Sequence, residues 1–209
     1  MASTARLLVP LLVAGGGIAA SLLLHDGRWL GLDTGAAGTA VLVLTAWGAL
    51  FALGRADLSA VENAVSPGEW RAWIGTVFTA VAVAYFVSKL RVFQGADLLH
   101  DPAVRAVTTR LVTLLVAWTV LSSMLDARWK HRVQRDERDA EVARQAAAWG
   151  RGATVAGIVV LAVTLGFSPA DRLTWATPPM IANQLILLVM VGSLFEYAAS
   201  ALRYMADRR

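Results

Sequence analysis

The sequence predicts an all-α integral membrane protein, a helical bundle of about six transmembrane helices, and three observations lead to this prediction. First, only 16% of the 209 residues are charged, whereas soluble domains carry about 25% charged residues. Second, the deficit comes from six apolar runs without any charge: 7–24, 34–54, 72–88, 111–125, 152–170 and 173–195. Third, these runs are apolar on every side, whereas helices of a soluble bundle keep a polar face.

A helix needs roughly 17–25 predominantly apolar residues to cross a bilayer, and five of the six runs meet this requirement unaided. The run at 111–125 meets it by starting near Val104 and including Arg110. We predict spans over about 5–24, 34–54, 70–89, 104–125, 151–169 and 179–202, in a single transmembrane domain over 1–209. The first run resembles a signal sequence, but its apolar core is longer than usual and it lacks a convincing cleavage site, so we expect a retained span.

Proline and capping residues predict where several helices begin. Residues 66–69, Ser-Pro-Gly-Glu, form a capping box with proline at the first helical position. Asp-Pro at 101–102 gives the same signal for the fourth span, and Thr-Pro-Pro at 177–179 marks the start of the sixth. Ser-Pro-Ala-Asp at 168–171 predicts a short capped turn between the last two spans.

Positively charged residues indicate the orientation of the bundle. If both termini are cytoplasmic, thirteen of the 19 Lys and Arg residues fall on the cytoplasmic side, seven of them between Arg128 and Arg151. Cytoplasmic loops carry an excess of Lys and Arg, so we expect cytoplasmic termini and a cytoplasmic polar helical loop at 126–150. The same bias explains the net charge of +4, and we expect no direct contact with nucleic acid.

Groups that catalyse reactions or bind metals are sparse. The chain has no cysteine, which excludes disulfides, thiolate metal sites and dithiol chemistry. His25, His100 and His131 are scattered, and the sequence contains no metalloprotease, serine-hydrolase or phosphate-loop motif. We therefore expect no enzymatic activity, no cofactor and no metal ion, and a lipid-active membrane enzyme is the least favoured function.

Four polar side chains in the predicted spans are candidate functional groups, because burying such groups in lipid is costly and usually has a reason. Glu196 lies in the last span near its cytoplasmic end, where it could relay protons, bind a cation or form an ion pair with a nearby arginine. Arg110 lies near the outer end of the fourth span. It could extend to the lipid headgroups or form a hydrogen-bonded cluster with Asn183 or Gln184.

The predicted loop at 126–150 contains the longest polar stretch, VQRDERDAEVARQAA. On a helix, Arg135 would pair with Asp139, and Arg144 with Glu141. The interleaved arginines compete for the carboxylates, which argues against a divalent-cation site. Two interpretations remain: a salt-bridged helical extension of the flanking spans, or a surface that docks a partner. The docking residues would be Arg135, Asp136, Glu137, Arg138, Asp139 and Glu141.

The same stretch resembles a loop in a family of uncharacterised bacterial multi-pass membrane proteins. The resemblance rests on Asp-Glu-Arg at 136–138, the apolar Val142 and the alanine pair at 146–147, and it covers about 136–166. In that family a cytoplasmic D-E-R-x-x-x-V/I loop joins two spans. The resemblance implies no enzymatic activity. It implies sequestering or sensing, since some members resemble the membrane halves of small gene pairs with a helix-turn-helix regulator.

These observations predict a non-enzymatic multi-pass protein of the bacterial inner membrane, an interaction or regulatory component that docks a cytoplasmic protein through 126–150. The alternative is a small transporter or channel component that uses the intramembrane Glu196. We expect membrane lipids around the bundle, and the sequence leaves a homo-oligomer open.

Overall fold

The computed structural model describes residues 2–25, 27–29, 32–55, 67–93, 101–129 and 137–206. Within these ranges the chain forms six α-helices: α1 (Ala2–Leu24), α2 (Thr34–Arg55), α4 (Pro67–Lys89), α5 (Pro102–Trp129), α6 (Glu137–Phe167) and α7 (Pro178–Ala206). Two short 3-10 turns follow α4 and α6, namely η1 (Leu90–Phe93) and η2 (Ala170–Arg172). The predicted all-α helical bundle is confirmed.

A small hairpin between α1 and α2 is not predicted by the sequence. Two-residue strands, β1 (Arg28–Trp29) and β2 (Leu32–Asp33), pair antiparallel there. Thr34 ties the hairpin to the start of α2, because its hydroxyl donates to the carbonyl oxygens of His25 (2.6 Å) and Gly27 (2.9 Å). The hairpin therefore places Asp33 directly before helix α2.

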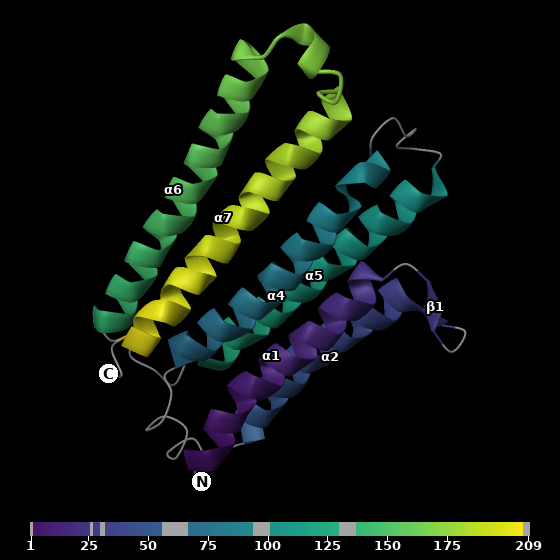
Figure 1. Cartoon of the computed structure of the whole chain (residues 1–209). Coiled ribbons are helices and arrows are strands. Elements are labelled where there is room, and N and C mark those ends of the chain that lie inside the picture. Colours follow the sequence, from purple (N-terminus) through teal and green to yellow (C-terminus); the bar gives the residue numbers. More distant parts are fainter. Residues whose placement is uncertain are drawn as a thin grey trace.

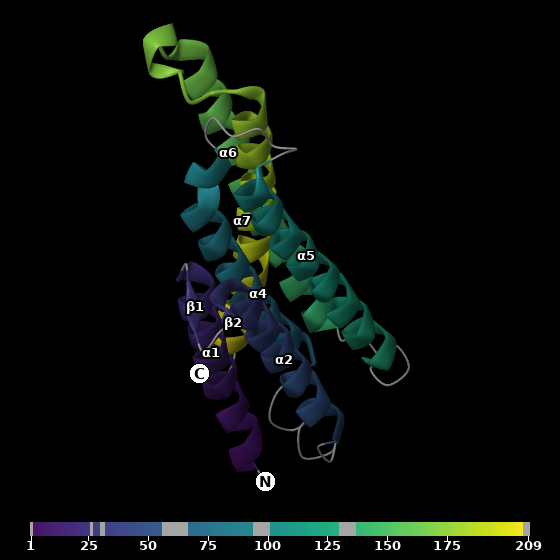
Figure 2. The same cartoon turned by 90° about the vertical axis from the view of Figure 1, so that its right-hand side faces the viewer.

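The six helices run alternately up and down. Helices α1, α4 and α6 begin at the lower end of the bundle in Figure 1, and α2, α5 and α7 end there. The β1–β2 hairpin and η2 lie at the opposite, upper end. Across the bundle the order is α6, α7, α4 and then α1 and α2, with α5 packed on α2 and α4. Figure 2 shows that α5 is inclined to α7, so that the lower ends of these two helices lie apart.

Four helical segments are long and apolar enough to cross a membrane: Gly68–Phe93, Pro102–Met124, Asp139–Phe167 and Pro178–Ala206. In α1 and α2, the stretches Pro10–Leu24 and Thr34–Ala49 are apolar but shorter. By length and composition, the chain is therefore a membrane protein. Large apolar side chains on the outside of the bundle, such as Val160 (65% exposed) and Phe167 (86% exposed), are suited to contact with lipid.

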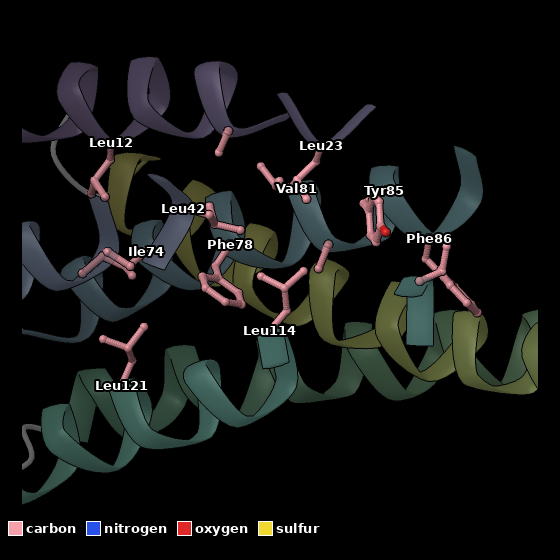
Figure 3. Packing of buried hydrophobic residues seen from close by; sticks show 14 of the residues in the cluster. Leu12, Leu23, Leu42, Ile74, Phe78, Val81, Tyr85, Phe86, Leu114 and Leu121 are labelled. Carbon is pink, nitrogen blue, oxygen red and sulfur yellow. The ribbon is translucent and has the colours of Figure 1, made fainter. Parts of the chain in front are cut away.

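The main apolar core surrounds α4. This helix touches α1, α2, α5 and α7, whereas α6 packs chiefly against α7. The labelled side chains in Figure 3 come from four helices of this core: Leu12 and Leu23 of α1, Leu42 of α2, Ile74, Phe78, Val81, Tyr85 and Phe86 of α4, and Leu114 and Leu121 of α5. Helix α4 is thus the central helix, and α1, α2, α5 and α7 pack against it.

Three helices begin at a proline, as the sequence predicts for the first helical position: Pro67 (α4), Pro102 (α5) and Pro178 (α7). Asp101 caps α5, because its Oδ1 accepts a hydrogen bond of 2.8 Å from the backbone N–H of Ala103. The turn expected at 168–171 is η2. The backbone N–H of Arg172 donates a hydrogen bond of 3.0 Å to the carbonyl oxygen of Pro169, and no side chain caps the turn.

Helix α6 runs without a break from Glu137 to Phe167. It therefore unites the second half of the 126–150 segment with the predicted span at 151–169. A helix has no physical reason to stop where it leaves an apolar layer if its residues also favour helix in water, and Ala, Glu, Arg and Gln all do. The first half of the segment includes residues 130–136, which lie outside the described part of the chain.

Candidate functional site

The lower ends of α4, α6 and α7 form a second, smaller core. Its buried members are Ala72 of α4, Val142 of α6, and Ala201 and Tyr204 of α7, with Trp73 packed against them. Apolar contacts thus hold the first turns of α6 on the last turns of α7. We call residues 67–73, 137–150 and 197–206, which surround this core, the lower platform.

Tyr204 is the central side chain of the lower platform. It is 7% exposed, and its hydroxyl donates a hydrogen bond of 2.9 Å to Oδ1 of Asp139 on α6. The same hydroxyl lies so close to Gly68 of α4 that a Cβ at that position would overlap it. One tyrosine therefore joins three helices, because Gly68 leaves room for it and Asp139 supplies an acceptor.

A second tyrosine repeats this arrangement further along α7. Tyr197 lies over Gly75 of α4, where an added Cβ would come within 2.5 Å of the tyrosine ring. Trp118 of α5 packs on Tyr197 edge to face, with ring centroids 5.3 Å apart, and also packs on Phe78 of α4 at 5.3 Å. Aromatic side chains therefore link α4, α5 and α7 at the upper edge of the lower platform.

Charged groups occupy the outer surface of the lower platform. Glu141 pairs with Arg144, as the helical spacing predicts, and also accepts a hydrogen bond from the amide of Gln145. The side chains of Arg144 and Glu141 are 76% and 43% exposed. An ion pair this exposed adds at most about 1 kcal/mol to stability, so the role of these charges is better sought in what they present at the surface.

The six predicted docking residues do not share one surface. Asp139 faces inward to Tyr204, whereas Glu141 lies on the outer surface. Residues two apart on a helix point about 200° away from each other, which explains this division. Glu137 and Arg138 lie in the first turn of α6. Arg135 and Asp136 are outside the described residues, so the expected Arg135–Asp139 pair is outside them too.

Helices α6 and α7 approach each other closely at Gly150 and Gly192. A Cβ at Gly150 would lie 2.8 Å from the carbonyl oxygen of Gly192, and a Cβ at Gly192 would lie 3.0 Å from that of Gly150. Glu196 follows one turn later on α7, with its Oε2 3.3 Å from the Cβ position at Gly150. In the described ranges, Glu196 forms no ion pair. The carboxylate therefore occupies the space that glycine leaves beside α6.

Arg110 belongs to a different cluster, at the upper end of the bundle. Its guanidinium pairs with Asp33 and donates a hydrogen bond of 3.4 Å to the hydroxyl of Tyr85. The structure thus gives Arg110 partners other than the lipid headgroups or the expected Asn183 and Gln184. These two amides lie partly buried near the start of α7. Asp33 was missed because it lies 77 residues from Arg110 in the sequence.

The sequence interpretation also missed the residues that assemble the lower platform, Tyr204 and its partner glycine Gly68. One signal could have suggested them. Gly68 and Gly75 are seven residues apart, and so are Tyr197 and Tyr204. Because seven residues make almost two turns, each pair lies on one face of its helix. Two small and two large residues at matched spacing are suited to face each other.

The part of the chain that the structure describes contains no group of three or more His, Asp or Glu side chains placed to hold a metal ion. No protein-family model, no curated protein and no solved structure matches the chain.

Proposed function

We propose that this chain is a non-enzymatic protein of the bacterial inner membrane that docks a cytoplasmic protein on its lower platform. The structure of the lower platform is the observation that carries the proposal. The first turns of α6 extend an apolar helix into a charged surface, and Tyr204 with the small core holds them on α7. A surface already ordered before binding loses less conformational entropy when a partner binds.

The orientation follows from the basic residues. In the described structure the lower ends of the helices carry Arg71, Arg144, Arg151 and Arg203, and these belong to the thirteen of 19 basic residues that six spans place on one side. The excess of Lys and Arg on cytoplasmic surfaces supports a cytoplasmic lower platform and cytoplasmic termini.

Helices α1 and α2 complete the proposed six spans. They contain 23 and 22 residues, and a helix of about 20 residues covers the roughly 30 Å of a hydrocarbon core. The alternating course of all six helices supports the same topology. Because the native chain has no cysteine, single cysteines at Arg172 and Arg144 would report the two sides to an impermeant thiol reagent without background.

The proposed partner is a soluble regulatory protein. The resemblance of 136–166 to a family of membrane proteins supports this class, since some members of that family resemble the membrane halves of gene pairs with a helix-turn-helix regulator. The surface itself is nearly balanced in charge, with seven basic and five acidic residues over 126–151. A segment that only tethered lipid headgroups would be more one-sidedly basic.

Photocrosslinking in cells tests the proposal. A photoreactive residue is placed at Ala140 or Ala143, both exposed on the lower platform, and for comparison at Val159 or Val163, both exposed on the apolar part of α6. We expect an adduct with one soluble protein from the first two positions and lipid adducts alone from the other two. Mass spectrometry identifies the partner.

Charge reversal provides the matched control for this experiment. Glu141→Lys combined with Arg144→Glu reverses the surface pair while keeping the net charge, and should abolish the protein adduct. Arg172→Glu combined with Asp171→Lys does the same at the exposed η2 turn and should leave the adduct unchanged. A protein adduct that survives the first double variant, or that forms equally from Val159, would refute docking on the lower platform.

Transport of a cation or proton is a second candidate function, and Glu196 favours it. This carboxylate lies in an apolar helix without an ion-pair partner in the described structure, beside the close approach of α6 and α7 at Gly150 and Gly192. If transport is the function, Glu196→Gln should reduce flux in proteoliposomes, while Glu141→Gln should not. Equal flux in the Glu196 variant and the native protein would exclude this candidate.

A further inference from the structure

A cluster of three side chains ties the upper end of α5 to the rest of the bundle. Arg110 of α5 pairs with Asp33 and donates a hydrogen bond to Tyr85 of α4. Asp33 also accepts a hydrogen bond of 3.1 Å from the backbone N–H of Gly35, at the start of α2. We call Asp33, Tyr85 and Arg110 the upper clasp, because they join α2, α4 and α5 through one guanidinium.

Gly35 allows the upper clasp to close. A Cβ at this position would overlap the guanidinium of Arg110 and lie 2.8 Å from its Nε. The planar guanidinium therefore rests directly on the backbone of α2. Any larger residue at position 35 would push Arg110 away without changing a charge.

The acidic side of the upper clasp is open to water. The side chain of Asp33 is 50% exposed and that of Arg110 is 21% exposed, whereas Tyr85 is fully buried. Water competes for an ion pair that is exposed on one side, which keeps the net stability of such a pair small. The ion pair can therefore open without exposing the apolar core.

The apolar contacts of α5 follow one row of side chains along the helix. The buried and partly buried members each lie three or four residues from another: Val104, Val107, Leu111, Leu114, Ala117, Trp118 and Leu121. Side chains beside this row, such as Leu115 (66%) and Val116 (56%), are exposed. A helix that packs along one narrow row can tilt or roll about that row. Arg110 lies next to the row, where its ion pair with Asp33 opposes such a movement.

Trp118 is the point at which α5 meets α7. Its indole packs between Phe78 of α4 and Tyr197 of α7. The two helices are inclined to each other (Figure 2). Trp118 therefore supports α5 near its middle, with the upper clasp on one side of it and the buried Leu121 on the other.

We propose that α5 is a movable helix, that the upper clasp of Asp33, Tyr85 and Arg110 holds it in the position described here, and that opening the clasp lets α5 turn about Trp118. Such a movement is of the hinge type, in which one helix moves against a fixed body. Because Trp118 contacts Tyr197, the movement changes the packing on α7.

Distance measurements between spin labels test this proposal. The native chain has no cysteine, so two labels can be attached to one chain through the pair of substitutions Ala36→Cys in α2 and Thr109→Cys in α5. Both positions are exposed at the upper end. A second pair, at Gly48 and Met124, reports on the lower part of the same two helices. In the native background we expect a narrow distance distribution for the upper pair.

Two variants open the upper clasp by different means. Asp33→Asn removes the charge but keeps an oxygen for the N–H of Gly35, and Gly35→Ala displaces the guanidinium and keeps every charge. Both should broaden the distribution of the upper pair and shift it to longer distances. The lower pair should change less, since Met124 lies closer to Trp118 in the sequence than Thr109 does.

The two label pairs together distinguish a hinge from general loosening. Unchanged upper distances in both variants would overturn the proposal, and so would equal broadening of both pairs. Tyr85→Phe removes one hydroxyl and leaves the ion pair, and should give a smaller shift in the same direction. It keeps the proposal testable if either stronger variant fails to fold.

Discussion

Helices α4 and α6 are both apolar enough to span a membrane, yet they differ in what covers them. In the most apolar part of α4, 44% of the residues are buried inside the protein, compared with 6% in α6. Helix α4 touches four other helices, whereas α6 packs chiefly against α7. Lipid is as apolar as a leucine side chain, so apolarity alone does not drive helices together in a membrane. Close packing at particular small and aromatic residues distinguishes the two helices.

The largest contrast between α4 and α6 should come from truncating apolar side chains. Phe78 of α4 is 3% exposed and packs on Trp118, so Phe78→Ala should lower the free energy of unfolding by about 3–5 kcal/mol. Val160 of α6 is 65% exposed, and Val160→Ala should change it by less than about 0.5 kcal/mol. Unfolding of both variants in detergent measures the difference. A similar loss of unfolding free energy in both variants would show that α6 is covered by protein at Val160.

The packing of α6 on α7 should be weakened by a larger residue at one glycine and left unchanged by the same residue at another. Gly192→Val places atoms against Thr154 and against the carbonyl oxygen of Gly150, 3.0 Å from the new Cβ, and should cost about 1–3 kcal/mol through overpacking. Gly152→Val meets nothing within 4 Å and serves as the control. Thermal unfolding compares the two. A loss of stability in the control that equals the loss in Gly192→Val would disprove the close approach.

The smallest effect concerns the polar tie of α6 to the lower platform. Tyr204→Phe removes the hydroxyl that bonds to Asp139 at 2.9 Å and should cost about 0.5–1.5 kcal/mol. A double-mutant cycle with Asp139→Ala isolates the pair. A coupling energy of zero would mean that the apolar core alone holds α6 in place. The upper clasp is unaffected by either change and remains an internal reference.

Local features of this fold could be predicted from the sequence. Pro67, Pro102 and Pro178 begin their helices, Asp101 caps α5, and Glu141 pairs with Arg144, because each depends on residues a few positions apart. The continuity of α6 agrees with one of the two sequence interpretations, a helical extension of the flanking span. A change from polar to apolar residues marks the surface of a bilayer but does not interrupt backbone hydrogen bonds.

The partners in both polar clusters were beyond a sequence interpretation. Tyr204 and Asp139 lie 65 residues apart, and Arg110 and Asp33 lie 77 apart. Only the packing of whole helices brings such residues together. Arg110 was recognised as a polar group that needs a partner, but the unpredicted β1–β2 hairpin determines where Asp33 is available.

The two tyrosines that lie over Gly68 and Gly75 fix how far α7 can slide along α4. A shift of one helical turn, about 5.4 Å, would bring both rings against residues larger than glycine. A slide of about 10.5 Å, seven residues at 1.5 Å each, would be needed before one tyrosine met a glycine again, and the other would then have lost its place. The position of Tyr204 along α4 is therefore fixed, because the next position that would fit lies too far away for thermal sliding to reach. The position of α6 along the bundle therefore depends on two glycines of α4, although α6 itself packs chiefly against α7.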